Sequence, residues 1–392
     1  MSTAVAVDNA KRARIESVDL LRGAIMVLMA LDHVRDFVGS RANPVNLATT
    51  TVPLFFTRWI THFCAPVFFL TMGMGARFAL GRRSKRELSR FLWTRGVWLI
   101  FLELVPLRCL AFQFNFDYRV TMLFILWALG WAMIILAALI YLPDWAIITC
   151  GAVAICAHNL LDGIQSTNPL FVILHSPGIL FAIGQHIVVV AYPLIPWFGV
   201  SAVGYGMGRI YGWEAERRKR FLLWLGIGLS LAFVVLRASN VYGDPNPWSV
   251  QKSGAFTVLA FLNTVKYPPS LLFLLMTLGP TTIALSALDG RSPKLLRPLL
   301  IIGRVPLFYY VLHIPLIHLI ALLICFVRYR HIYWVFQSPG VGSIPFTAPP
   351  GWGLSLPGVY LTWAVVVVLL YPLCKWWAGV KRRRTEPWLS YL

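Results

Sequence analysis

Histidines and arginines inside apolar stretches are the residues of this 392-residue sequence with the clearest chemical potential. Arg22 and His33 flank one such stretch, LRGAIMVLMALDH, and helical geometry projects the two side chains within about 20° of each other, roughly 16 Å apart along the axis. A neutral histidine can act as a general base and an arginine can bind an anionic group. Ionisable residues in apolar spans are costly, so the pair is a candidate site. The alternative is a snorkelling arginine and a histidine bonded to a neighbouring helix.

Two further stretches carry candidate catalytic side chains. RWITHFCAPVFF contains His62, and GRVPLFYYVLHIPLIH contains Tyr310 and His313, with prolines that either free carbonyls near a cavity or produce a structural kink. We predict catalytic roles for His33, His62, Tyr310 and His313. No HExxH helix, GxSxG elbow, P-loop or CxxC pair is present, so we expect no metal.

The composition predicts that the segments carrying these residues lie in a membrane. Hydrophobic residues make up 58% of the chain and the mean hydropathy is +0.70, against roughly 45–50% apolar residues in soluble domains. We predict one all-α membrane domain over residues 1–392, with a short basic segment at about 1–17 and a basic tail at about 381–392. The first twenty residues lack the apolar core of a signal peptide, so the first span is expected to insert by itself.

Apolar runs near 20 residues predict about ten transmembrane helices. They cover residues 18–38, 53–80, 91–112, 121–141, 145–161, 186–210, 221–239, 268–288, 299–327 and 358–380.

Charge in the connecting loops orients these spans. Lys and Arg are concentrated in the alternate loops that share a side with both chain ends, which predicts that both termini are cytoplasmic. This topology places seven of the eight histidines on the exoplasmic side and indicates a polar site open to that side. The basic residues follow the cytoplasmic loops and form no basic aromatic platform, so no nucleic-acid partner is expected.

Aromatic residues in the exoplasmic loops are candidate sugar-binding groups. Trp248, Trp334 and Trp352 lie among Gly and Pro residues after the seventh and ninth spans. Their rings could stack on a sugar, whereas anchoring at the membrane interface is the alternative.

Several stretches resemble a known family. They are RIESVDLLRGAIMVLMALDHVRDF, FCAPVFFLTMGMGARFAL, YPLIPWFGVSAVGYGMG, KYPPSLLFLLMTLG, GRVPLFYYVLHIPL and PWLSYL. The sequence is similar to bacterial heparan-alpha-glucosaminide N-acetyltransferase-like integral-membrane acyltransferases, and its Arg22 and His33 match a pair in the related surface-sugar O-acyltransferases. The late motif of that related group is matched at Gly303, Tyr310 and His313, but Pro306 replaces its hydroxyl residue. The loop RANPVNLATTTVP lacks the histidine that the lysosomal relative uses, so the catalytic role falls on His33.

The resemblance implies an acyl-CoA-dependent acyltransferase in the bacterial cytoplasmic (inner) membrane. An acyl group, acetyl by family default, would move from cytosolic acyl-CoA across the bilayer to an amine or hydroxyl of an exoplasmic sugar or glycan. His33 would be the general base and Asp36 would orient its ring, while His62 and His313 would accept a second proton or carry the acyl group. The expected CoA-phosphate ligands are Arg22, Arg82, Arg83, Arg217 and Arg218. The alternative for the last four, which lie in inner loops, is that they only set the membrane topology.

Some alternatives stay open at this point. The acyl chain, the acceptor, N- or O-acylation, an acyl-histidine intermediate and a homodimer are not decided by the sequence. A secondary transporter or permease for a small polar solute would also use buried His and Arg residues and proline-broken helices, and is the second functional interpretation.

Overall fold

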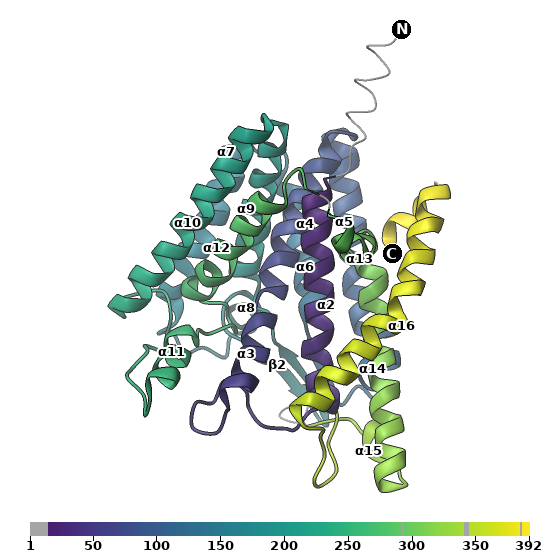
Figure 1. Ribbon diagram of the computed structural model, residues 1–392. Coiled ribbons are helices and arrows are strands. Elements are labelled where there is room, and N and C mark those ends of the chain that lie inside the picture. Colours follow the sequence, from purple (N-terminus) through teal and green to yellow (C-terminus); the bar gives the residue numbers. More distant parts are fainter. Residues whose placement is uncertain (1–14, 292, 341–344, 385) are drawn as a thin grey trace.

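The structure is a computed structural model that describes residues 15–291, 293–340, 345–384 and 386–392. Most of the predicted basic segment at about 1–17 lies outside these ranges. The long helices run roughly side by side, and the first helix begins at the end of the bundle where the chain also ends (Figure 1). We call this the terminal end and the other the distal end.

Helices dominate both halves of the chain. The first half contains α2 (Glu16–Val38), α3 (Val52–Thr61), α4 (Cys64–Leu80), α5 (Lys85–Leu102), the π-helix η1 (Glu103–Phe112), α6 (Ile125–Leu139), α7 (Asp144–Ala157), the 3-10 turn η2 (His158–Leu161) and α8 (Pro169–Leu174). The second half contains α9 (Leu194–Gly208), η3 (Arg209–Gly212), α10 (Ala215–Ser239), α11 (Gly254–Leu262), α12 (Leu271–Leu288), η4 (Lys294–Leu296), α13 (Arg297–Gly303), α14 (Pro306–Tyr329), α15 (Tyr333–Phe336), α16 (Leu356–Arg383) and η5 (Pro387–Tyr391).

A small sheet at the distal end departs from the all-α prediction. Its strands β1 (Val120–Leu123), β2 (Gly178–Ile183) and β3 (His186–Val190) lie in the order β1-β3-β2. Strand β3 pairs parallel with β1, placing Val120 opposite Ile187, and antiparallel with β2. The predicted fourth and sixth spans were therefore wrong at their starts. The run of β-branched residues in β3 favours extended backbone, and Pro193 delays the following helix to Leu194.

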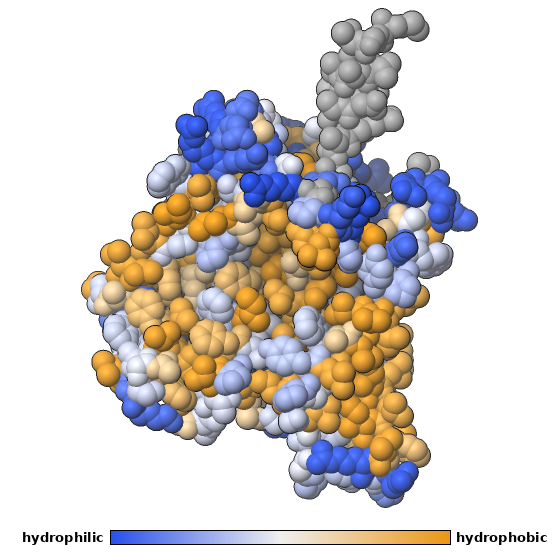
Figure 2. Space-filling view, viewed as in Figure 1, coloured by the Kyte–Doolittle hydropathy of each residue, from blue (hydrophilic) through white to orange (hydrophobic). Residues whose placement is uncertain are grey.

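The structure confirms a mostly helical chain with several candidate membrane spans. Within the described ranges, six helical segments are long and apolar enough to cross a membrane: Val52–Leu80, Asp144–Leu161, Ala215–Ser239, Leu271–Leu288, Pro306–Tyr329 and Leu356–Arg383. Helices α6 and α9 have 15 residues each, fewer than the roughly 20 that span a hydrocarbon core. Ten spans and cytoplasmic termini stay predictions. Apolar side chains form a broad band between polar ends, as membrane immersion requires (Figure 2).

Helix α2 lies at the centre of the bundle, where α3, α4, α12, α13, α14 and α16 pack against it. Its closest neighbour is α13. A side chain at Gly23 would overlap the backbone of Leu299, and one at Gly303 would overlap the backbone of Asp19. Glycine at both positions lets the two backbones touch, as small residues do between membrane helices. This contact holds the start of α14 beside α2.

Candidate functional site

The structure brings His33 of α2 and His313 of α14 into direct contact, although they are 280 positions apart. Nδ1 of His33 lies 2.6 Å from Nε2 of His313, and the two rings stack with their centroids 4.9 Å apart. His313 is fully buried and His33 is partly exposed. The two histidines predicted from separate stretches thus form one pair.

Hydrogen-bond partners assign the protons of this pair. The carbonyl oxygens of Tyr310 and Tyr309 lie 2.6 Å and 3.2 Å from Nδ1 of His313. A carbonyl only accepts, so this Nδ1 carries the hydrogen, and Nε2 of the neutral ring must accept. Nδ1 of His33 is then the donor to His313. The lone pair that remains in the neutral pair is on Nε2 of His33, which can take a proton.

The carboxylates beside His33 are paired with arginines. Asp32 accepts from the guanidinium of Arg58, from Thr61 Oγ1 at 3.0 Å and from Arg35, whose Nη2 lies 3.0 Å away. Asp36 accepts from Nη2 of Arg35 at 2.6 Å, and its side chain is 43% exposed. Asp36 is expected to orient the His33 ring, but the structure pairs Asp36 with Arg35. Nδ1 of His33, the nitrogen that such a carboxylate would hold, is bonded to His313 instead.

A cavity of about 280 Å³, here called the apolar cavity, lies between α2, α4, α5, α6 and α14. Its walls are mostly aliphatic and aromatic, and two cations, Arg22 and Arg95, line it. Nη2 of Arg22 donates to the carbonyl oxygen of Thr71 at 2.5 Å. Tyr310 also lines the cavity, and its ring meets that of His313 edge-on with the centroids 5.3 Å apart. The cavity is therefore separated from the histidine pair by one aromatic ring.

The other arginines predicted to bind CoA do not line the apolar cavity. Arg83 lies closest, with its guanidinium 4.4 Å from the ring centroid of the cavity residue Phe91, and Arg82 is exposed on the same turn. Arg217 stacks on Trp213, while Nε of Arg218 donates to Asp289 at 2.7 Å. Arg217 and Arg218 lie in the first turn of α10, and their contacts with Trp213 and Asp289 hold that turn in place.

A second cavity of about 410 Å³, the polar cavity, opens between α3 and the segments that flank α11. His62, Arg58, Lys266 and Trp248 are among the residues that line it. Nδ1 of the buried His62 has no hydrogen-bond partner within the described chain, and no hydrogen bond to His33 or His313 is found there either. His62 thus belongs to this cavity and not to the pair.

The polar cavity is cationic. Lys266 is only 8% exposed, and its ammonium makes no hydrogen bond or ion pair with any described residue, while it lies 5.2 Å from the centroid of the Tyr267 ring. Burial alone would raise the pKa of the Tyr267 phenol, but the nearby charges of Lys266 and Arg58 lower it below its ordinary value. No carboxylate of the described chain contacts the Lys266 ammonium directly, so this cavity favours a ligand that compensates the charge or is neutral.

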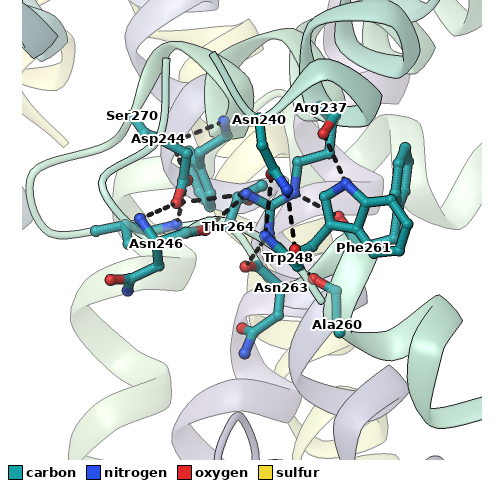
Figure 3. Close-up of polar contacts among 12 residues, drawn as sticks. Arg237, Asn240, Asp244, Asn246, Trp248, Ala260, Phe261, Asn263, Thr264 and Ser270 are labelled. Atoms are coloured by element: carbon teal, nitrogen blue, oxygen red, sulfur yellow. Dashed lines mark hydrogen bonds and ion pairs between the residues drawn. The ribbon is translucent and has the colours of Figure 1, made fainter. Parts of the chain in front are cut away.

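Arg237 builds the wall of the polar cavity (Figure 3). Its guanidinium donates to the backbone carbonyls of Phe261, Asn246, Ala260 and Asn263 at 2.8–3.0 Å, and it pairs with Asp244 at 3.6 Å. One buried cation thereby ties the end of α11 to the loop that follows α10. Trp248 joins the network through its indole N–H, which donates to the Arg237 carbonyl at 2.8 Å.

The three predicted sugar-binding tryptophans separate into two groups. Trp248 lines the polar cavity, whereas Trp334 and Trp352 pack around Tyr329 at the far end of α14. The indole N–H of Trp352 also donates to the carbonyl of Phe37 at 3.1 Å. Trp334 and Trp352 therefore have contacts typical of residues that stabilise the fold.

Arg95, Arg58 and Lys266 are site residues that the sequence analysis did not select. Arg95 stands alone in the apolar run FLWTRGVW, a signal of the same kind as that of Arg22. Arg58 is four positions before His62, on the same face of a helix. Lys266 has no such signal, because its burial depends on loops that are remote in sequence.

Comparison with known proteins places the chain among membrane acetyltransferases. The model of the family described as heparan-alpha-glucosaminide N-acetyltransferase, catalytic, matches residues 14–237, which is more than half of the chain. The match includes His33, His62 and Arg95 and ends before α14, which carries His313. No curated protein matches the chain.

Replacing Asp32 should destabilise the bundle strongly. The Asp32→Ala change leaves Arg58 buried without its carboxylate, and breaking a buried ion pair costs roughly 3–5 kcal/mol. Asp36→Ala on the same helix removes a carboxylate that is 43% exposed and should cost less than about 1 kcal/mol. Thermal unfolding in one detergent, followed by tryptophan fluorescence, compares the two variants. Equal losses for both would contradict the assignment of Asp32 as the buried anchor.

Proposed function

Because the chain belongs to the heparan-alpha-glucosaminide N-acetyltransferase catalytic family, we propose that it transfers an acetyl group from cytosolic acetyl-CoA to an amine of an exoplasmic sugar or glycan. The observation that carries this proposal is the neutral His33–His313 pair, which presents Nε2 of His33 as a base. On one side the pair meets the apolar cavity through Tyr310. On the other, Asp32, the neighbour of His33, is bonded to the polar-cavity residue Arg58.

The proposed topology comprises ten transmembrane helices in a single domain, with both termini on the cytoplasmic side of a bacterial inner membrane. The loop charges support this orientation. The apolar cavity then lies toward the cytoplasm, because Arg22 is near the start of α2, and the polar cavity lies toward the exoplasmic side. Each substrate would enter from its own compartment.

The residues of the apolar cavity fit the donor. When bound, acetyl-CoA supplies a thioester carbonyl that an amine can attack. Aliphatic walls suit the slender pantetheine arm, and Arg22 and Arg95 suit anionic phosphate groups at its end. The exposed Arg82 and the partly exposed Arg83 on the turn beside Phe91 would extend this cationic surface for the nucleotide.

His33 performs the proton transfers in this proposal. Its Nε2 takes the proton of the acceptor amine as the amine nitrogen bonds to the acetyl carbon, and it returns that proton to the sulfur when the carbon–sulfur bond breaks. His313 acts as a positioning residue, since its Nε2 holds His33 Nδ1 and fixes the tautomer. The carbonyls of Tyr309 and Tyr310 stabilise the positive charge while the pair holds the extra proton.

The polar cavity fits the acceptor. Its positive charges from Lys266 and Arg58 favour the neutral, nucleophilic form of an amine over its ammonium form. Trp248 offers an aromatic face to the sugar and His62 a hydrogen-bonding ring. The cavity therefore selects the amine in its reactive state.

Loss of the base should remove activity. His33→Ala is expected to lower kcat by about 10²–10⁴-fold, the usual worth of general base catalysis. His313→Gln should retain more activity than His313→Ala, because the amide oxygen can still accept from Nδ1 of His33. Transfer of radiolabelled acetyl from acetyl-CoA to glucosamine by purified, folded protein measures these rates. His331→Ala, at an exposed loop histidine, is the control, and wild-type transfer by His33→Ala would overturn the proposal.

The donor site can be tested with a truncated donor. Arg95→Gln should raise the KM for acetyl-CoA roughly tenfold or more, as expected when a hydrogen bond to a charged group is lost. The KM for acetyl-pantetheine, which lacks the nucleotide, should stay unchanged. Arg217→Gln removes a cation outside the cavity and serves as the matched control. An equal effect of Arg95→Gln on both donors would contradict phosphate binding.

The acceptor site predicts a pH-dependent loss. Lys266→Gln removes a positive charge beside the amine, so the ammonium form persists to higher pH and kcat/KM for glucosamine falls at neutral pH by about tenfold per unit of pKa change. At alkaline pH the loss should shrink, because the amine is neutral without help. Lys252→Gln, at an exposed loop lysine, is the charge-matched control. A loss that is the same at every pH would contradict this role.

A further inference from the structure

Two histidines and an aspartate converge at the distal end of α7, apart from the histidine pair. They are His158 and Asp162, four positions apart around η2, and His175, which follows α8. One possible ligand atom from each residue can be chosen so that all lie within 4.8 Å of one another. His158 begins the tight 3-10 turn η2 and Asp162 directly follows it, so the turn keeps the two side chains near each other, and a loop brings in His175.

The histidines of this cluster are buried without adequate partners. His158 is 3% exposed, and neither of its ring nitrogens makes a hydrogen bond within the described chain, although the Pro269 carbonyl lies beside the ring. His175 is 2% exposed, and its Nδ1 also lacks a partner there. Burying polar nitrogens without hydrogen bonds costs free energy, so the native protein needs something to satisfy them.

Asp162 is oriented as a ligand would be. Its Oδ1 lies 3.2 Å from Nε2 of His175, and its Oδ2 accepts from Nδ2 of Asn159 at 2.7 Å. Asn159 is itself fixed, because its Oδ1 accepts from the backbone N–H of Leu271 at 2.8 Å. Ligating carboxylates are commonly held by such an outer hydrogen bond.

We propose that His158, Asp162 and His175 bind a zinc ion. Two imidazole nitrogens and one carboxylate oxygen suit Zn²⁺, with water completing the tetrahedral set. Ligands at about 2.0–2.2 Å from the metal require the side chains to close in slightly from their present spacing. The ion would fasten η2 to the segment that enters β2. A simple His175–Asp162 ion pair would leave at least one nitrogen of His158 unsatisfied, because the Pro269 carbonyl can accept from only one of them.

Metal content and stability test the site directly. Full-length protein without a polyhistidine tag is purified in detergent, stripped with EDTA and titrated with ZnSO₄ against a chromogenic zinc chelator. We expect one zinc per chain, and a rise in the unfolding temperature on adding zinc, because a ligand that binds only the folded state stabilises it. His158→Gln and Asp162→Asn should each weaken zinc binding roughly tenfold or more and reduce the thermal shift at a given zinc concentration.

The controls separate a built site from adventitious binding. His186→Gln removes an exposed histidine of the same distal end, and it should leave the zinc stoichiometry and the thermal shift unchanged. Co²⁺ in place of Zn²⁺ should give the visible absorption of a tetrahedral site in wild type and in His186→Gln, but not in His158→Gln. Wild-type protein that binds less than one zinc per chain, or that keeps its zinc after both His158→Gln and Asp162→Asn, would overturn the proposal. If a variant does not fold, the wild-type stoichiometry and Co²⁺ spectrum decide alone.

Discussion

Burying the polar face of α2 inside an apolar bundle costs free energy unless each side chain finds a partner. The partners come from different helices. Arg22 donates to the Thr71 carbonyl of α4, Asp32 accepts from Arg58 of α3, and His33 is bonded to His313 of α14. The same contacts that satisfy α2 therefore assemble the site. If α2 packed elsewhere in the bundle, its charged side chains would be buried without partners. The contacts that fix the position of α2 are therefore the ones that form the site.

The position of His313 opposite His33 depends on packing about three helical turns away. Gly23 and Gly303 allow the α2 and α13 backbones to touch. Helix α13 ends at Gly303, with Arg304 as its C-cap, and α14 begins at Pro306. Arg304 reaches back to Glu16 at the start of α2, with Nη2 3.2 Å from Oε1. Because α14 starts from this fixed point, its second turn, which carries His313, faces the C-terminal half of α2, which carries His33. Backbone contact at the terminal end thus determines which side chains meet deeper in the bundle.

Sequence patterns predicted the helices well and their partners poorly. Runs of apolar residues locate the helices because each must bury or immerse an apolar surface, and helical periodicity singled out Arg22 and His33 on one face. Periodicity within one helix does not show which other helix packs against it. It favoured Asp36 as the partner of His33, whereas His313 occupies that place and Arg35 takes the carboxylate. The prediction of a helix from residue 186 is wrong for the strand His186–Val190, because apolarity alone does not separate a strand from a helix.

A histidine partner suits the proposed base better than a carboxylate would. An unpaired carboxylate in an apolar interior would favour the imidazolium form of His33 before any acceptor arrives, and a protonated ring cannot take a proton. The structure keeps the nearby carboxylates occupied, Asp32 with Arg58 and Asp36 with Arg35. His313 can fix the tautomer of His33 while both rings stay neutral, and it shares the charge only after proton transfer. The arginines around α2 thus contribute to the proposed reaction without touching the substrate, because they pair with the carboxylates beside the base and offset their charge.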